Sequence, residues 1–252
     1  APDLFSAGGA GAMDVIDQLR QASEDDGVAA VILRVDSPGG AVVASDEIAR
    51  AIARLRGRKP VVASMGDLAA SGGYYVASQA NRVIANPGSI TGSIGVIAVL
   101  PNLEGAAEKL GIRPIVIKSG ELKDAGSPFR DMTAEERALY QRLLDEAHEQ
   151  FIDAVASGRG MDTEEVRRLA DGRIFSGAQA EASGLVDDLG DLDRAYDFAL
   201  ALAELDRDDA RLVELRAGVG LGDLLFFGAR SPVDEIKREL GIGLGLQYLY
   251  IP

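Results

Sequence analysis

Short apolar runs rich in β-branched residues alternate with amphipathic segments, and this alternation constrains the fold more than any other feature of the sequence. Residues 28–35 and 60–65 have the composition of buried strands. Between them, residues 45–55 place Ile48, Ile52 and Leu55 on one face of a helix. Strands that alternate with helices in this way form parallel sheets with right-handed crossovers. We therefore expect an α/β fold of repeated βαβ units.

The same patterns predict further elements along the chain. Thr133 and Glu136 form a capping-box pair at the start of a long helix, and Asp162 with Glu165 repeats the signal. The further helices are expected at residues 71–79, 133–158, 162–171 and 191–205, and the further strands at 82–85, 94–100, 112–118 and 210–216. We therefore expect a single α/β domain with helical appendages.

The absence of cysteine and the presence of one histidine exclude several chemistries. A thiol protease, a disulfide scaffold and a cysteine-built zinc site are impossible. A Ser-His-Asp triad could use only His148, which helical spacing places on a polar face among carboxylates. We expect that histidine to be a solvated surface residue. A hydrolase with this sequence therefore needs another base.

The charge balance argues against a polyanionic partner. The chain has 26 basic and 40 acidic residues, a formal net charge of −14 at pH 7. Nucleic-acid binding requires lysine and arginine on phosphates, so we expect no nucleic-acid partner. An anionic membrane surface would also repel this chain on average. Its acidic surface is typical of a globular protein kept soluble by charge.

Two glycine-flanked turns follow the first two predicted strands. One is Ser37-Pro38-Gly39-Gly40, and the other runs from Gly66 to Gly73 and contains Ser71 at the start of a helix. Ligands of open α/β sheets bind at the carboxyl ends of the strands. There, N–H groups of the two turns could form an oxyanion hole beside the serine hydroxyl. From spacing alone, a helix N-cap is the commoner role for such a serine.

A nucleophilic serine without a usable histidine needs a lysine or a carboxylate as its base. Lys118 and Lys123 lie in one glycine-containing loop after the predicted strand at 112–118. A lysine acts as a general base only when its neutral form is accessible. Most loop lysines are simply exposed, and composition does not choose between these two.

Five motifs in order give the sequence a family resemblance. They are VILRVDSPGG, MGDLAASGGYYVAS, ANPGSITGSIGV, IKSGELKDAGSPFRDMTAEER and GRIFSGAQAEASGLVDDLG. With these motifs the chain resembles, from about Met13 to Leu205, the signal peptide peptidase A family. Those proteins are serine proteases of the ClpP/crotonase superfamily that use a Ser-Lys dyad. The resemblance implies a ClpP/crotonase-like fold, with a peptidase domain over residues 1–206 and a C-terminal extension over 207–252.

The resemblance also implies roles for individual residues. Ser71 matches the family's nucleophile and Lys123 its general base, in preference to Lys118. Gly39 and Gly40 match the oxyanion turn, with the amide of Gly72 as a further donor. Ser93 matches a serine that positions the lysine through a hydrogen bond. Neither a cofactor nor a metal is implied.

The substrates implied are apolar, extended peptides, namely the signal peptides that remain in the membrane after preprotein cleavage. Members of the family assemble into ring- or dome-shaped homo-oligomers that are anchored in the membrane, with the catalytic domain extracytoplasmic. Anchoring is expected to come from a segment absent from this chain. Two alternatives stay open: a crotonase-like enzyme acting on acyl-CoA thioesters, and an inactive scaffold in a membrane complex. The tail after Arg216 lies outside the match, and packing on the body is its expected role.

Overall fold

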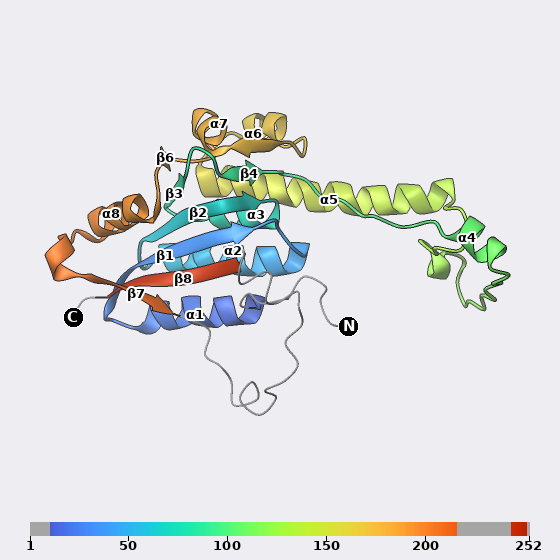
Figure 1. The fold of residues 1–252 in the computed structure, drawn as a ribbon, viewed down its shortest axis with the longest axis horizontal. Helices are drawn as coiled ribbons and strands as arrows, with labels where there is room; N and C mark the ends of the chain where they lie inside the picture. The colour runs from blue at the N-terminus through green and yellow to red at the C-terminus, as the bar shows by residue number, and fades with distance from the viewer. Residues whose placement is uncertain (1–10, 216–242, 251–252) are drawn as a thin grey trace, which may run out of the picture. The chain divides into compact units, whose positions relative to one another are not determined.

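The centre of the molecule is the predicted strand–helix–strand unit. In the computed structural model, which describes residues 11–215 and 243–250, β1 (Val28–Ser37) and β2 (Val61–Ala70) are parallel neighbours. They are connected by α2 (Val42–Arg56). Figure 1 shows this unit in the middle of the sheet. The expected α/β class is confirmed.

The sheet divides along β2 and becomes antiparallel at its edges. The first half of β2 pairs with β3 (Arg82–Ala85) and the second half with β4 (Ile90–Gly92), both in parallel. The outer strands are β5 (Ile174–Ser176), antiparallel to β4; β6 (Asp188–Leu189), parallel to β3; β8 (Gly243–Tyr250), antiparallel to β1; and β7 (Arg211–Leu215), antiparallel to β8. The sheet is therefore mixed, with a parallel centre.

The described helices confirm the capping signals. Thr133 and Glu136 form the predicted reciprocal cap, while the side chains of Asp162 and Asp191 cap the following helices. The helices other than α2 are α1 (Ala12–Glu24), α3 (Gly72–Ala77), α4 (Glu104–Lys109), α5 (Ala134–Arg159), α6 (Thr163–Leu169), α7 (Gly177–Ala182) and α8 (Leu192–Ala203), with the 3₁₀ turns η1 (Glu121–Asp124) and η2 (Arg207–Asp209).

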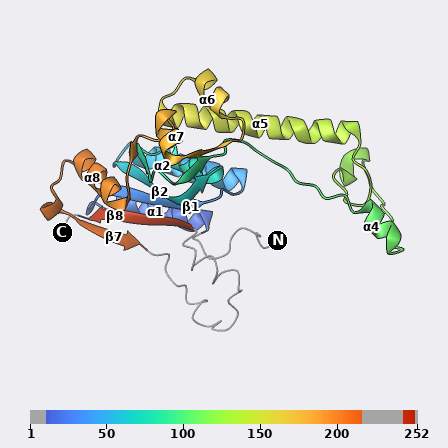
Figure 2. The same ribbon diagram turned by 45° about the horizontal axis from the view of Figure 1, so that its top comes forward.

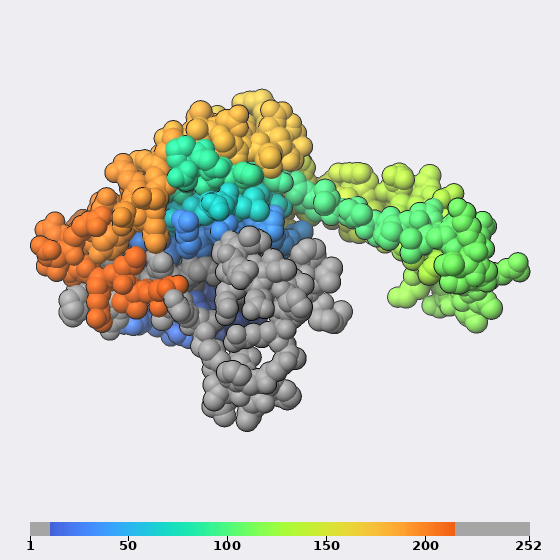
Figure 3. Space-filling view, viewed as in Figure 1, coloured from blue at the N-terminus to red at the C-terminus, as the bar shows by residue number. Residues whose placement is uncertain are grey.

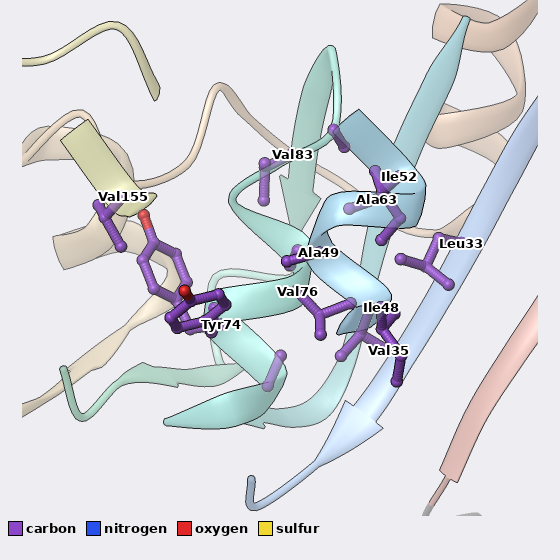
Figure 4. Close-up of a cluster of buried hydrophobic side chains, with 14 of the residues drawn as sticks. Leu33, Val35, Ile48, Ala49, Ile52, Ala63, Tyr74, Val76, Val83 and Val155 are labelled. Carbon is purple, nitrogen blue, oxygen red and sulfur yellow. The ribbon is translucent and has the colours of Figure 1, made fainter. Parts of the chain in front are cut away.

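The two faces of the central sheet are covered by different helices. Val31, Leu33 and Val35 of β1 join a core cluster that includes residues of α1, α2 and α3, and part of this cluster is drawn in Figure 4. The alternate residues Ala30 and Ile32 join a second cluster with α8. This alternation follows from the two-residue period of a strand. Figure 2 shows the helices around the sheet from a second direction.

Residues 96–150 form a second unit, distinct from the unit of residues 1–95 and 151–252 that carries the sheet. The second unit contains α4, η1 and the first part of α5. In the sheet-bearing unit, Figure 3 shows α6 and α7 gathered beside the strands β3 and β4.

Two predicted strands are wrong. Residues 94–100 and 112–118 have no strand structure. Ile94 is buried, but most of their other β-branched side chains are exposed, with Ile115 at 89% and Ile117 at 95%. A strand is stable only when its backbone pairs with a neighbour, and no described strand pairs with these segments. The β-branched pattern of these segments therefore predicted strands that the structure does not contain.

The boundary between residues 206 and 207 stays a prediction. In the described part of the expected extension, β7 and β8 extend the sheet through pairing with β1. Residues 216–242 of the tail lie outside the described residues.

Candidate active site

The first component is the turn that follows β1. The pairing of β1 with β2 shifts register between Val35 and Ser37, which leaves Asp36 at an irregularity of the ladder. The Asp36 carboxylate accepts a hydrogen bond from the N–H of Leu68 at 3.0 Å. Burial raises the pKa of Asp36, and that N–H opposes part of the rise. Asp36 thereby ties the end of β1 to the last residues of β2.

Ser71 stands between β2 and α3 in an unusual backbone conformation. Its φ is 52° and its ψ is −122°, a region that a residue with a side chain rarely adopts. Its N–H donates to the carbonyl of Gly92 at 2.8 Å, and its own carbonyl accepts from Tyr75 at 2.8 Å. The Ser71 side chain makes no capping hydrogen bond to the helix. The common N-cap role is therefore not the role of this hydroxyl.

Helix α3 holds Ser71 from its buried side. Gly73, Tyr74, Tyr75, Val76 and Ala77 are all buried. The Tyr74 hydroxyl donates to the carbonyl of Leu185 at 2.8 Å, and burial raises its pKa above the ordinary value. The turn that carries Ser71 is consequently held in place by the closely packed, mostly apolar residues of α3.

The Gly39–Gly40 turn lies directly against Ser71 and Gly72. At φ +118°, Gly39 adopts a conformation that favours glycine, and a Cβ there would lie 2.8 Å from Ser71 Cβ and 3.1 Å from Ser71 Oγ. A Cβ on Gly72 would lie 3.0 Å from the amide nitrogen of Gly40. Within the described part of the chain, the N–H groups of Gly40 and Gly72 donate to no acceptor. Two unpaired donors thus lie close to one hydroxyl.

Ser93 occupies a position equivalent to that of Ser71 on the next strand. Ala70 pairs with Gly92, so the residues that follow them, Ser71 and Ser93, leave the sheet side by side. Ser93 also has a positive φ, 50°, and its N–H donates to the backbone carbonyl of Arg173 at 2.8 Å. The sheet register therefore brings the predicted supporting serine to the predicted nucleophile.

Lys123 lies in the second unit, in the turn η1. Its side chain is exposed and makes no hydrogen bond or ion pair with a described residue. Lys118, the alternative base, instead donates to the carboxylate of Asp124 at 2.6 Å and to the carbonyl of Glu121 at 2.7 Å. Of the two lysines, Lys123 is the one whose amine is not engaged in this loop.

The described geometry gathers four of the six predicted site residues, Gly39, Gly40, Ser71 and Gly72, and places Ser93 beside them. Lys123 belongs to the other unit. His148 differs from expectation, because it is half-buried and its Nε2 is shielded from solvent without a hydrogen-bond partner among the described residues. Its pattern of neighbouring charges had indicated a solvated side chain.

Sequence reasoning missed two residues that support the site. Asp36 lies inside the VDSPGG motif, but its tie to Leu68 depends on the register shift, which no local pattern reveals. Ser45 of α2 is buried, and a Cβ on Gly72 would clash with its Oγ. Glycine at position 72 therefore lets the serine turn pack against α2.

The described residues offer neither a candidate metal site nor a candidate membrane span. Among them, no group of three or more His, Cys, Asp or Glu side chains could hold a metal ion. No helix of residues 11–215 is both long and apolar enough to cross a bilayer.

A mixed α/β sheet with a strained serine at a strand end, beside unpaired backbone N–H groups, defines a protein of the hydrolase type. Comparison with known families identifies the class more closely. The model of peptidase family S49 matches residues 53–206. The chain belongs to that family, the family of the signal peptide peptidases A, and the expectation of a protease is confirmed at this level.

Several relatives carry corresponding names. The "Putative protease" of Synechocystis is 42% identical over 87% of this chain and 79% of its own length. The "Putative signal peptide peptidase SppA" of Enterococcus faecium is 40% identical over 85% of this chain and 62% of its own length. The chloroplastic serine protease SPPA of Arabidopsis thaliana is 36% identical over 94% of this chain but only 36% of its own length.

Proposed function

We propose that the chain is a serine endopeptidase in which Ser71 is the nucleophile and Lys123 the general base. The observation that carries this proposal is the approach of the Gly39–Gly40 turn to Ser71, with the N–H groups of Gly40 and Gly72 unpaired. Because the Ser71 hydroxyl forms no capping hydrogen bond with α3, it is available to attack a substrate carbonyl. Family membership favours this reading over an acyl-CoA enzyme.

In the proposed reaction, Ser71 Oγ attacks the carbonyl carbon of the scissile peptide while its proton passes to Lys123. The N–H groups of Gly40 and Gly72 stabilise the oxyanion of the tetrahedral intermediate. An oxyanion donor of this kind contributes about 3 kcal/mol to the transition state. Collapse of the intermediate breaks the C–N bond, and Lys123 returns the proton to the leaving amine. Lys123 then takes a proton from water, and the hydroxide formed hydrolyses the acyl-enzyme.

The substrates we propose are apolar, extended peptides, including remnant signal peptides. One relative is named as a signal peptide peptidase, which supports this choice. The exposed backbone and side chains of residues 96–100, which include Ile97 and Val99, could pair with an extended peptide. A location at a membrane, with the catalytic domain extracytoplasmic, is part of the same proposal.

We also propose that the chain forms a homo-oligomer. Ile115 and Ile117 are each more than 80% exposed, and they lie in a segment, residues 112–118, with a strand-like composition but no strand partner among the described residues. Exposed apolar segments of this kind are typical of surfaces that bind a protein. The proposed partner is a second copy of this chain.

Steady-state hydrolysis of a short apolar fluorogenic peptide tests the dyad. Ser71→Ala should abolish turnover, and Lys123→Ala should lower kcat by about 100-fold or more, the usual worth of a positioned general base. Lys109→Ala is the matched control, because that exposed lysine at the end of α4 belongs to the same unit but lies outside the loop that carries Lys123. Undiminished turnover of Ser71→Ala would exclude this mechanism.

A further inference from the structure

The turn that carries Lys123 is held by a network of ion pairs that the proposed reaction does not use. Asp124 directly follows Lys123 in η1. One of its carboxylate oxygens accepts from Lys118 at 2.6 Å, and the other accepts from Nε of Arg130 at 3.1 Å. Arg130 also donates to the Asp124 carbonyl at 3.2 Å. The residue next to the lysine is therefore held through both its side chain and its backbone.

Arg130 is in turn fixed to the start of α5. Its Nη1 donates to Glu136 at 2.9 Å, and its Nη2 bonds the other oxygen of the same carboxylate. A bidentate arginine–carboxylate pair fixes the orientation of both groups. Glu136 is 2% exposed and also accepts from the N–H of Thr133 at 2.9 Å. The network thus connects the lysine turn to the capping box of a long helix.

A second set of contacts holds the other side of the turn. Lys118 donates to the carbonyl of Glu121 at 2.7 Å, and the Tyr140 hydroxyl of α5 donates to the carbonyl of Ala125 at 3.0 Å. Gly126 has φ +78° and packs closely against Tyr140, with a Cβ placed there 2.6 Å from the hydroxyl oxygen. Backbone carbonyls on both sides of Lys123 are therefore engaged.

The Lys123 side chain takes part in none of these contacts. Its amine bonds no described residue, although the neighbouring cations Lys118 and Arg130 are both paired. A general base must be held at a fixed position and still keep its amine free to accept a proton. A rigid turn with an unengaged lysine meets both requirements.

We propose that Asp124, Arg130 and Glu136 form a clamp that positions Lys123 for proton transfer. The inference rests on the proposed function of Lys123. Asp124, Arg130 and Glu136 are positioning residues, because they act through the lysine and touch neither the substrate nor the reacting atoms. Their loss should reduce kcat and leave KM little changed, since peptide binding does not involve them.

The test compares Asp124→Asn, Arg130→Gln, Arg130→Lys and the double variant Asp124→Asn/Arg130→Gln in the peptide assay. Each single loss should lower kcat by about 10- to 100-fold, the range that a misplacement of about 1 Å produces. The double variant should lose no more than the worse single variant, because both changes break one network. Arg130→Lys should also lose activity, since an ammonium cannot bridge two carboxylates as a guanidinium does.

The decisive measurement repeats Asp124→Asn in a Lys123→Ala background. A residue that acts only through Lys123 should not lower the residual rate further once the lysine is gone. Asp17→Asn, which breaks the exposed pair with Arg20 on α1, is the matched control and should leave kcat unchanged. Circular dichroism of every variant establishes that it is folded, and an unfolded Asp124→Asn is replaced by Arg130→Lys in the same cycle.

The outcomes separate the clamp from the dyad. A normal kcat for folded Asp124→Asn and Arg130→Lys would overturn the clamp and leave the dyad in place. An equal further loss in the Lys123→Ala background would also overturn it, because the carboxylate would then act independently of the lysine. A fully active Lys123→Ala would instead contradict the proposed function itself.

Discussion

At the scale of single residues, Gly39 and Gly40 show how adjacent glycines serve different purposes. Gly39 is required by its backbone, since it has φ +118° and lies against the Ser71 side chain. Around Gly40, a Cβ would meet nothing within 4 Å. What Gly40 offers is its unpaired N–H, which any residue except proline retains.

This difference gives a matched pair of substitutions. Gly39→Ala should lower kcat/KM by about 100-fold or more, because the new methyl group displaces Ser71, and strain at the positive φ should cost about 1–3 kcal/mol of stability. Gly40→Ala should lower kcat/KM by only a few-fold. Peptidase kinetics and urea unfolding of both variants check this. Equal losses at the two positions would contradict the described packing.

Features of single residues could be predicted from the sequence where they depend on neighbouring residues in the chain, and not where they depend on tertiary contacts. The glycine turns and the place of Ser71 between a strand and a helix could be predicted, because strand ends and turn residues are local features. The choice between Lys118 and Lys123 could not be made from composition, since it depends on the pairing of Lys118 with Asp124. The shielded Nε2 of His148 was missed for the same reason, because burial depends on tertiary packing.

At the scale of elements, the start of α5 is marked by the lowered pKa of its cap residue Glu136. The ion pair with Arg130, with a smaller contribution from the N–H of Thr133, lowers the pKa of Glu136 from 4.5 to about 2. A carboxylate whose pKa is depressed in the folded state stabilises the fold fully above its unfolded pKa. That stability is lost as the pH falls through the folded value.

The free energy of unfolding should therefore decrease between about pH 4.5 and pH 2, and part of the decrease should belong to Glu136. Glu136→Gln should be less stable than the wild type at pH 7, and the difference should shrink as the pH approaches 2. Urea unfolding at a series of pH values measures this. Glu135→Gln, an exposed neighbour in the same helical turn, is the control. A difference independent of pH would contradict the role given to the carboxylate.

Elements with internal signals were predicted well, whereas elements that depend on partners were not. The capping residues identified α5 and α6, and the β-branched runs identified β1, β2 and β3. Residues 94–100 and 112–118 carry the same β-branched signal but lack a strand partner among the described residues. The short strands β4 and β5 were missed, because three residues give too little periodicity to recognise.

At the scale of the whole molecule, the segment of residues 112–118, which has no strand partner among the described residues, bears on assembly. Ile117→Asp should lower the mass observed by sedimentation velocity, because a charge at a buried contact between copies is costly. Asp17→Asn on α1 is the control and should sediment like the wild type. An unchanged mass for Ile117→Asp, or a monomeric wild type at micromolar concentration, would count against the proposed homo-oligomer.

Active-site labelling tests directly whether Ser71 is the nucleophile. The experiment requires no knowledge of the substrate. A fluorophosphonate reacts with an activated serine, and mass mapping of the labelled peptide identifies the residue. We expect one label, on Ser71, that is lost in Ser71→Ala and forms much more slowly in Lys123→Ala. A label on another serine, or labelling at the wild-type rate without Lys123, would contradict it.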